Sequence, residues 1–376
     1  MMTSRSVRTL SSLGSCAWLA AALSVALGLA CKQTEPSPGG ATASPVSAAE
    51  VPKVASPGPS GVVRAVSADA ALLLRPTTAA FRGQRLWVAI GQLSALFEAG
   101  KTPVLPFAAR SFELATGTPA ADTVELPGAD YYPEGIAAAS DGSLYIGSIM
   151  QGVISKVAPG TTVATPFVTR GVARRGVIGV TVDAARQLLW FCDSNPKLEE
   201  ARKAGELVGV RLSDGTEVAR HVLPPLDGKA PFCNDTIVSP DGALWITESA
   251  GGRVFRVPAN AALTSGTAEA WVTGGEVGPP PSGGSGANGL EWVDGTLIVA
   301  NVGRGTLVAL DPASTEPSRG ARVIALRDAA GAPVTLCSPD GLERVPGSPN
   351  ALIVVENGGC PSKAPRIAEV ALALGS

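Results

Sequence analysis

Histidine is almost absent from this sequence: of its 376 residues, His221 is the one histidine. A zinc site built from several histidines is therefore excluded, and a Ser-His-Asp triad is poorly supported. Charge of one sign is not in excess either, because 30 basic residues stand against 32 acidic ones and the net charge is −2. This balance gives no sign of a nucleic-acid partner or of a surface for anionic lipids.

A C-x-x-C pair is also missing, which leaves little support for a zinc or thiol-redox site. What the sequence has in quantity is Gly (44) and Pro (31), a composition that favours many tight turns and disfavours long helices. Apolar residues make up 45% and charged residues 16% of the chain. A large core is therefore available to a folded domain.

The N-terminus reads as a signal peptide over residues 1–30. Arg5 and Arg8 precede an apolar run, residues 16–30, that is short for a membrane-spanning helix. The run ends at Ala30 and Cys31, which resembles the bacterial lipoprotein cleavage box, although Gly28 stands where a Leu is usual. We predict lipidation at Cys31, with ordinary secretion and nearby cleavage as the alternative.

Residues 31–60 are predicted to be a disordered tether. The segment from residue 32 to residue 60 contains six prolines and no aromatic residue, so it cannot bury enough surface to fold. We expect a protein of the cell envelope, periplasmic or associated with the outer membrane, that contacts the membrane through its lipid anchor alone.

A repeat runs through the remaining chain. Its marker is a pair of apolar strand residues: Leu86-Trp87, Leu144-Tyr145, Leu189-Trp190, Leu244-Trp245, Leu297-Ile298 and Leu352-Ile353. The second members of these pairs are 58, 45, 55, 53 and 55 residues apart. Three of the pairs follow an Asp-Gly turn, a strong hairpin signal: Asp141-Gly142, Asp241-Gly242 and Asp294-Gly295. The aromatic members are most simply core residues.

A second short strand opens about 9 to 12 residues before five of these pairs, at Glu134, Ile178, Asn234, Asn288 and Asp340. Three to four strands in each of six repeats, without amphipathic helices between them, indicate an all-β, six-bladed β-propeller over residues 61–376. A pair of β-sandwiches is the competing architecture. The first strand of each propeller blade lines the central channel, so these five residues are expected to form one ring at the channel mouth.

Four of the five ring residues carry oxygen ligands: Glu134, Asn234, Asn288 and Asp340. Sets of carboxylate and amide oxygens select hard cations, and Ca²⁺ accepts both kinds, so we predict a site for Ca²⁺ or another divalent cation. Without a cation the two carboxylates would repel each other and raise a pKa. The simpler interpretation of each residue taken alone is turn chemistry.

These stretches resemble the senescence marker protein/gluconolactonase/luciferin-regenerating family of six-bladed, calcium-binding propellers. The resemblance covers roughly residues 75–370 and rests on Pro133-Glu134-Gly135, FCNDTIVSPDGALWITES (232–249), GANGLEW (286–292) and SPDGLE (338–343). It implies the metal ligands Glu134, Asn234, Asn288 and Asp340, with Asp340 also acting as general base.

One departure from the family concerns the substrate. Sugar-lactonase members carry an Arg two residues before the first metal Asn, where this chain has Phe232. Replacing a guanidinium with an apolar ring argues against an aldonolactone and favours a less polar small molecule. Phe232 and Asp235, which lie on either side of Asn234 in the sequence, are the expected substrate contacts.

The resulting functional hypothesis is Ca²⁺-dependent hydrolysis of a lactone or small ester. The alternative is a non-catalytic propeller that binds a small molecule or a cell-envelope partner around a structural calcium. Whether the chain is an enzyme stays open at this point. The Gly/Pro-rich loop 273–287 leads into Asn288 and is either a lid or a linker between blades.

Four cysteines remain beyond Cys31: Cys192, Cys233, Cys337 and Cys360. In an exported protein they allow three pairings. We favour Cys337–Cys360, because both residues belong to the last repeat, and then Cys192–Cys233 between neighbouring repeats. Reduced buried thiols and a Cys233–Cys337 bond are the alternatives.

Overall fold

The computed structural model of the protein describes residues 58–169, 171, 175–195, 205–228, 230–361 and 363–375. The predicted signal peptide, the lipidation site at Cys31 and nearly all of the predicted tether lie outside the described residues. Among the helices that are described, none has the length and apolar character needed to cross a membrane.

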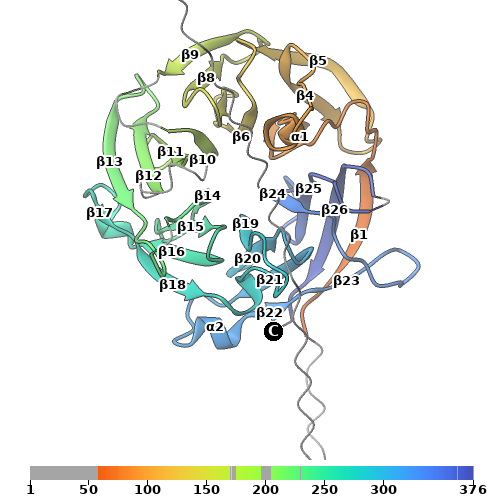
Figure 1. The fold of residues 1–376 in the computed structure, drawn as a ribbon, viewed down its shortest axis with the longest axis vertical. Helices are drawn as coiled ribbons and strands as arrows, with labels where there is room; N and C mark the ends of the chain where they lie inside the picture. Colours follow the sequence, from red (N-terminus) through yellow and green to blue (C-terminus); the bar gives the residue numbers. More distant parts are fainter. Residues whose placement is uncertain are drawn as a thin grey trace, which may run out of the picture. The chain divides into compact units, whose positions relative to one another are not determined.

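The described strands form six sheets arranged radially around one axis, which is a six-bladed β-propeller (Figure 1). The all-β fold predicted from the repeat is confirmed. Blade 1 is made of β2 (Ala79–Arg82), β3 (Arg85–Ala89), β4 (Phe107–Glu113) and β5 (Pro119–Leu126). Blade 2 is made of β6 (Pro133–Ala138), β7 (Leu144–Ser148), β8 (Ile154–Val157) and β9 (Ala164–Val168). Blade 3 is made of β10 (Val177–Asp183), β11 (Leu188–Asp193), β12 (Glu206–Arg211) and β13 (Glu217–Val222), and the short strand β17 (Gly266–Thr267) pairs with its outer edge.

Blades 4 to 6 follow in the same order. Blade 4 is made of β14 (Cys233–Val238), β15 (Leu244–Glu248), β16 (Arg253–Val257) and β18 (Glu269–Thr273). Blade 5 is made of β19 (Ala287–Val293), β20 (Thr296–Asn301), β21 (Thr306–Leu310) and β22 (Arg322–Val323). Blade 6 is made of β24 (Pro339–Arg344), β25 (Ala351–Glu356) and β26 (Arg366–Ala373), together with β1 (Ser60–Ser67) and β23 (Ala325–Arg327). Short helical turns lie at α1 (Leu93–Phe97), η2 (Ala259–Ala261), η3 (Gly275–Val277) and α2 (Pro317–Gly320).

The last blade is completed by the first described strand. β1 pairs antiparallel with β26, from Ser60 opposite Ala373 to Ser67 opposite Ile367. In Figure 1 the orange β1 lies beside the blue β26. Strand hydrogen bonds therefore join the two ends of the described chain, and the ring of blades closes without a free edge between its first and last elements.

All six predicted apolar pairs lie in the second strand of a blade. These strands are buried on both faces, because each face packs against a neighbouring blade, and they therefore read as continuous apolar runs. Trp87, Tyr145, Trp190 and Trp245 are at most 2% exposed, which confirms them as core residues. Gly142, Gly242 and Gly295 adopt φ of 85°, 83° and 76°, as the Asp-Gly hairpin turns require.

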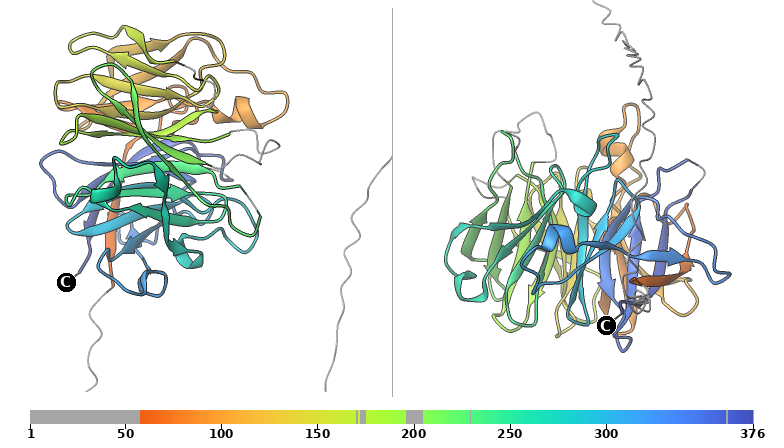
Figure 2. Two further views of the ribbon diagram at one scale, coloured as in Figure 1. Left: turned by 90° about the vertical axis from the view of Figure 1, so that its left-hand side faces the viewer. Right: turned by 90° about the horizontal axis from the view of Figure 1, so that it is seen from below.

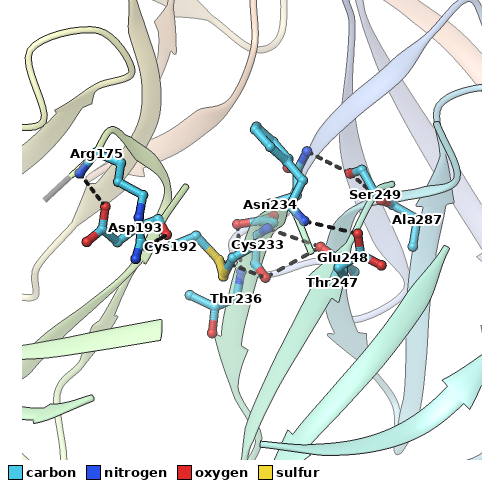
Figure 3. Close-up of a disulfide and its surroundings, with 12 residues drawn as sticks. Arg175, Cys192, Asp193, Cys233, Asn234, Thr236, Thr247, Glu248, Ser249 and Ala287 are labelled. Carbon is cyan, nitrogen blue, oxygen red and sulfur yellow. Dashed lines mark hydrogen bonds between the residues drawn. A yellow bond between two sulfur atoms is a disulfide. The ribbon is translucent and has the colours of Figure 1, made fainter. Parts of the chain in front are cut away.

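Both favoured disulfides are present. Cys192–Cys233 joins β11 of blade 3 to β14 of blade 4, and Cys337–Cys360 lies within blade 6. The first of them is drawn in Figure 3, immediately beside Asn234. The covalent link therefore fixes the start of the strand that carries a candidate metal ligand.

Candidate functional site

Each of the five predicted ring residues lies in a β-bulge at the start of an inner strand. The antiparallel register slips between Pro133 and Ile136 in blade 2, and at the corresponding point in blades 3 to 6. A bulge frees residues from the ladder and redirects their side chains. The same β-bulge occurs in all five blades, so the ring side chains do not follow the alternating directions of regular strand residues.

Close packing of the inner strands explains the glycine that follows most ring residues. A Cβ added at Gly135 would lie 2.2 Å from the carbonyl oxygen of Ile178, and one at Gly289 would lie 2.1 Å from that of Asp340. Each glycine therefore lets its blade approach the ring residue of the next blade. Gly341 closes the circle onto blade 1, where its N–H donates to the carbonyl oxygen of Thr77 at 2.9 Å.

The four oxygen-bearing ring residues line one cavity of about 650 Å³. Glu134, Asn234, Asn288 and Asp340 share it with Asn357, Ser338, Ser249, Ser285 and several apolar side chains. Ile178, the fifth ring residue, is fully buried and is not among the described residues that line the cavity. The four polar residues of the predicted ring therefore lie around one cavity, and the apolar fifth residue, Ile178, is not among its described lining.

The electrostatics of this cavity favour a cation. Two buried side-chain oxygens, Glu134 Oε2 and Asn288 Oδ1, lack a hydrogen-bond partner. Burial, together with the charges of Asp340 and Asp235, raises the pKa of Glu134 well above its usual range. Among the described residues lining the cavity there is no Lys, Arg or His to balance these acids.

This donor set fits Ca²⁺, because it offers two carboxylates and two amide groups and leaves buried oxygens unsatisfied. Within the described residues, no group of three or more His, Cys, Asp or Glu side chains is placed to hold a metal. The candidate site therefore depends on the amide oxygens of Asn234 and Asn288 as much as on Glu134 and Asp340.

Asp340 is oriented by a residue that the sequence analysis did not find. Asn357 donates its side-chain N–H to Asp340 Oδ2 at 2.7 Å and also to the carbonyl oxygen of Pro76. Burial raises the pKa of Asp340 to about 7, the amides of Asn357 and Asn288 oppose the increase, and the charge of Asp235 adds to it. Asp340 is therefore a buried carboxylate with one oxygen fixed by a neutral donor.

Asn234 is held in a comparable way. Its Nδ2 donates to Ser249 Oγ at 2.9 Å, and Ser249 Oγ donates to the carbonyl oxygen of Ala287 at 2.7 Å (Figure 3). Because the nitrogen is already engaged, the amide is fixed with its oxygen directed away from Ser249. This oxygen is the atom that a hard cation would use.

A buried carboxylate anchors the loop in front of Asn234. Glu248 accepts hydrogen bonds from the backbone N–H groups of Phe232 (3.0 Å) and Ala250 (2.7 Å), and forms an ion pair with Arg253 (2.9 Å). Glu248 and Arg253 are at most 3% exposed. The backbone next to Phe232 and Asn234 is consequently fixed by the buried Glu248 carboxylate.

The position of Glu248, the last residue of the second strand, has a counterpart in four other blades. The five residues are Ser148, Asp193, Glu248, Asn301 and Glu356, each three residues after the second member of the apolar pair. The next position holds Ile149, Ser249, Val302 and Asn357 in blades 2, 4, 5 and 6, and these four line the cavity. The repeat spacing carries this signal, and a search at these two offsets finds the residues.

The two predicted substrate contacts differ in position. Phe232 lines the cavity, whereas Asp235 is not among the described residues that do. The Asp235 carboxylate accepts the backbone N–H groups of Thr236 (2.9 Å) and Leu290 (3.3 Å). This placement gives Asp235 a role in joining the inner strands of blades 4 and 5.

Two further acids, three residues beyond ring positions, lie on the inner strands of blades 5 and 6. Burial raises the pKa of Glu291 to about 7 and that of Glu343 to about 8, and the charge of Glu291 adds to the shift at Glu343.

His221 lies on the outer part of blade 3, buried, with Nε2 hydrogen-bonded to the carbonyl oxygen of Ala262 at 2.9 Å. It takes no part in the cavity.

No family model matches the sequence, and no curated protein matches it. Solved structures do match. A calcium-binding protein, regucalcin, from Agrobacterium tumefaciens shares 16% identity over 82% of this chain and 94% of its own, with a TM-score of 0.55. A gluconolactonase from Xanthomonas campestris shares 14% over 83% and 90%, with a TM-score of 0.54.

A luciferin-regenerating enzyme shares 12% identity over 82% of this chain and 95% of its own, with a TM-score of 0.56. These neighbours agree with the resemblance drawn from the sequence motifs. At such low identity the similarity shows a common propeller fold, of the type used by lactonases, and the activity has to be argued from the site itself.

Proposed function

We propose that this protein is a calcium-dependent hydrolase of lactones or small esters. The observation that carries the proposal is the pair of unpartnered buried oxygens, Glu134 Oε2 and Asn288 Oδ1, in a cavity whose described lining holds two acids and no basic side chain. Glu134, Asn234, Asn288 and Asp340 would hold the ion. A bound calcium ion supplies a Lewis acid that polarises the substrate carbonyl.

Asp340 is the proposed general base. Its carboxylate takes a proton from the attacking water, the water oxygen adds to the carbonyl carbon, and the carbonyl carbon–oxygen bond to the leaving group breaks. The proton then passes from Asp340 to the leaving oxygen, which balances the reaction. Asn357 keeps Asp340 in place throughout, because it binds the carboxylate on one side and the backbone of Pro76 on the other.

The deciding experiment measures hydrolysis of a panel of lactones and aryl esters by the full chain, with calcium and with EGTA. We expect activity that follows calcium and a loss of at least about 10²-fold in Asp340→Asn, since general-base catalysis contributes about 10²–10⁴-fold. Asp311→Asn is the matched control, because this exposed aspartate caps a turn by accepting the N–H of Ala313.

Full activity in the chelator would contradict the proposal. Calcium-dependent thermal stabilisation without turnover of any substrate would instead support the alternative, a non-catalytic propeller that binds a small molecule around a structural ion.

We also propose that Cys31 carries the lipid anchor and places the propeller at the cell envelope. The support is the Ala30-Cys31 box after the apolar run and the proline-rich segment that follows it. Growth with an alkyne-tagged fatty acid should label the wild-type chain and leave Cys31→Ser unlabelled. Equal labelling of both chains would contradict the assignment.

A further inference from the structure

The cavity that holds the ring residues has a wall of apolar side chains. They come from four parts of the fold: Leu93 and Phe97 of α1, Ile149 after β7, Phe232 before β14, and Val302 after β20. In Figure 2 α1, drawn in orange, projects from one face of the propeller. The wall therefore combines a projecting segment of blade 1 with positions that follow the blade repeat.

Several of these side chains are placed where exposure to water is unfavourable without a ligand. Phe97 is 60% exposed, and α1 buries none of its residues. Phe232 is half-buried and lines the cavity, and its backbone N–H donates to Glu248. Apolar area of this kind, inside a cavity, stabilises a bound apolar group when both leave water.

The polar groups of the cavity offer a polyhydroxylated ligand acceptors and few free donors. The amide nitrogens of Asn234 and Asn357 already donate to Ser249 and Asp340. In the described lining there is no Lys, Arg or His to offer further donors. Hydroxyl groups placed against the apolar wall would lose their bonds to water without replacement, which disfavours binding.

We propose that the cavity selects an uncharged carbonyl compound, a lactone or ester, that carries an alkyl or aryl substituent. The carbonyl lies toward Glu134 and Asp340, and the substituent packs against Phe232, Phe97 and the other apolar wall residues. The reaction in this statement rests on the proposed function, whereas the ligand preference rests on the wall alone. A volume of about 650 Å³ is within the range of small-ligand sites, about 300–1,000 Å³.

The test measures binding without turnover. Lactams replace the hydrolysable ring oxygen with nitrogen, so a series of 5-alkyl-γ-lactams from methyl to octyl is titrated calorimetrically into the full chain with calcium. Burial of each methylene should lower Kd about three- to fourfold until the wall is covered. Glucono-lactam, the polyhydroxylated comparison, should bind at least about 100-fold more weakly than the longest alkyl lactam.

Two variants locate the preference. Phe97→Asn should flatten the dependence of Kd on chain length, and Leu263→Asn should not, although Leu263 is a comparably exposed apolar residue (58%) outside this cavity. Phe232→Arg should weaken binding of the alkyl series and strengthen that of glucono-lactam. Both Phe97 and Leu263 are on the surface, so neither change threatens folding.

A Kd independent of chain length, or tighter binding of glucono-lactam to the wild-type chain, would overturn the proposed preference. Such a result leaves the hydrolase proposal standing if lactones are still turned over with calcium. Conversely, a steep chain-length dependence without any hydrolysis supports the ligand class while the proposed reaction fails.

Discussion

Blades 1 to 3 and blades 4 to 6 share one strand pattern but contribute unequally to the central axis. At the ring position the first half presents Thr77, Glu134 and Ile178, and the second half presents Asn234, Asn288 and Asp340. The second half also carries three partly buried acids with raised pKa values, Asp235, Glu291 and Glu343, on its inner strands. Because Ile178 occupies the same bulge as Asn234, the fold does not itself require a polar ring residue.

The charged anchors behind the ring differ in how far water reaches their basic partners. Asp193 in blade 3 pairs with Arg220, whose side chain is 19% exposed, and Glu356 in blade 6 pairs with Arg366, whose side chain is 26% exposed. The side chain of Arg253, the partner of Glu248 in blade 4, is 4% exposed. A charge left without its partner costs more where water cannot reach it. The anchor of blade 4 is therefore expected to contribute more to stability than the anchors of blades 3 and 6.

The largest expected effect is on stability, at this anchor. Glu248→Ala removes the carboxylate that balances the buried charge of Arg253, which keeps its hydrogen bond to the carbonyl oxygen of Pro224, and it frees the backbone N–H of Phe232. The free energy of unfolding should therefore fall by about 3–5 kcal/mol. Asp193→Ala should cost less, and Glu316→Ala, which breaks an exposed pair with Arg319, about 0–1 kcal/mol. Urea unfolding measures all three; equal losses for Glu248→Ala and Asp193→Ala would remove the distinction between the anchors of blades 3 and 4.

Copying the ring residue of blade 3 into blade 4 tests the functional side of the comparison. Asn234→Ile removes an amide oxygen from the candidate ligand set and keeps a residue that the same bulge accepts at Ile178. We expect the calcium affinity to fall by about tenfold or more. Calorimetric titration with calcium measures the affinity, and circular dichroism checks the fold; unchanged calcium affinity would remove Asn234 from the site.

The fold and most of the ring could be predicted from the sequence because both repeat. The apolar pairs recur at near-constant spacing, and Asn234, Asn288 and Asp340 keep step with them. Glu248 and Asn357 occupy repeating positions as well, at the last residue of the second strand and at the residue after it. Spacing finds these positions, but the role of each residue depends on the groups that it contacts, which spacing does not give.

Two other features depend on local geometry that the pattern does not encode. α1 has five residues and no side-chain cap, and it follows Gln92 in the left-handed region at φ 53°, so no helix signal marks it. Asp235 stands next to a ring residue, yet the slip in register between Cys233 and Thr236 leaves its carboxylate on backbone N–H groups. A one-residue irregularity of this kind decides which of two adjacent polar residues reaches a cavity.

The raised pKa of Glu343 on the inner strand of blade 6 predicts a dependence of stability on pH. Burial and the charges of Glu291 (β19) and Asp235 (β14) raise the pKa of Glu343 to about 8, while Arg344 and the backbone N–H of Phe81 (β2) oppose the shift. The folded chain then keeps a proton that the unfolded chain releases near pH 4.5. This contribution to stability is complete below that pH and is lost as the pH rises through about 8.

Glu343→Gln should therefore stabilise the metal-free protein at pH 8 relative to the wild type, by on the order of 1–2 kcal/mol after allowance for water in the channel. At pH 4.5 the two proteins should differ little. Urea unfolding in EDTA at both pH values gives the comparison, with Glu125→Gln on the outer strand β5 as the control. A pH-independent difference would contradict the shift at Glu343.

The smallest effect belongs to the apolar ring residue of the first half. Ile178→Val removes one buried methylene group from the core, which costs about 0.5–1.5 kcal/mol of unfolding free energy. Because Ile178 is absent from the described lining of the cavity, calcium affinity and turnover should stay unchanged. Thermal unfolding and calcium titration of the same preparation separate the two readouts. A change in calcium affinity here would mean that blade 3 takes part in the site.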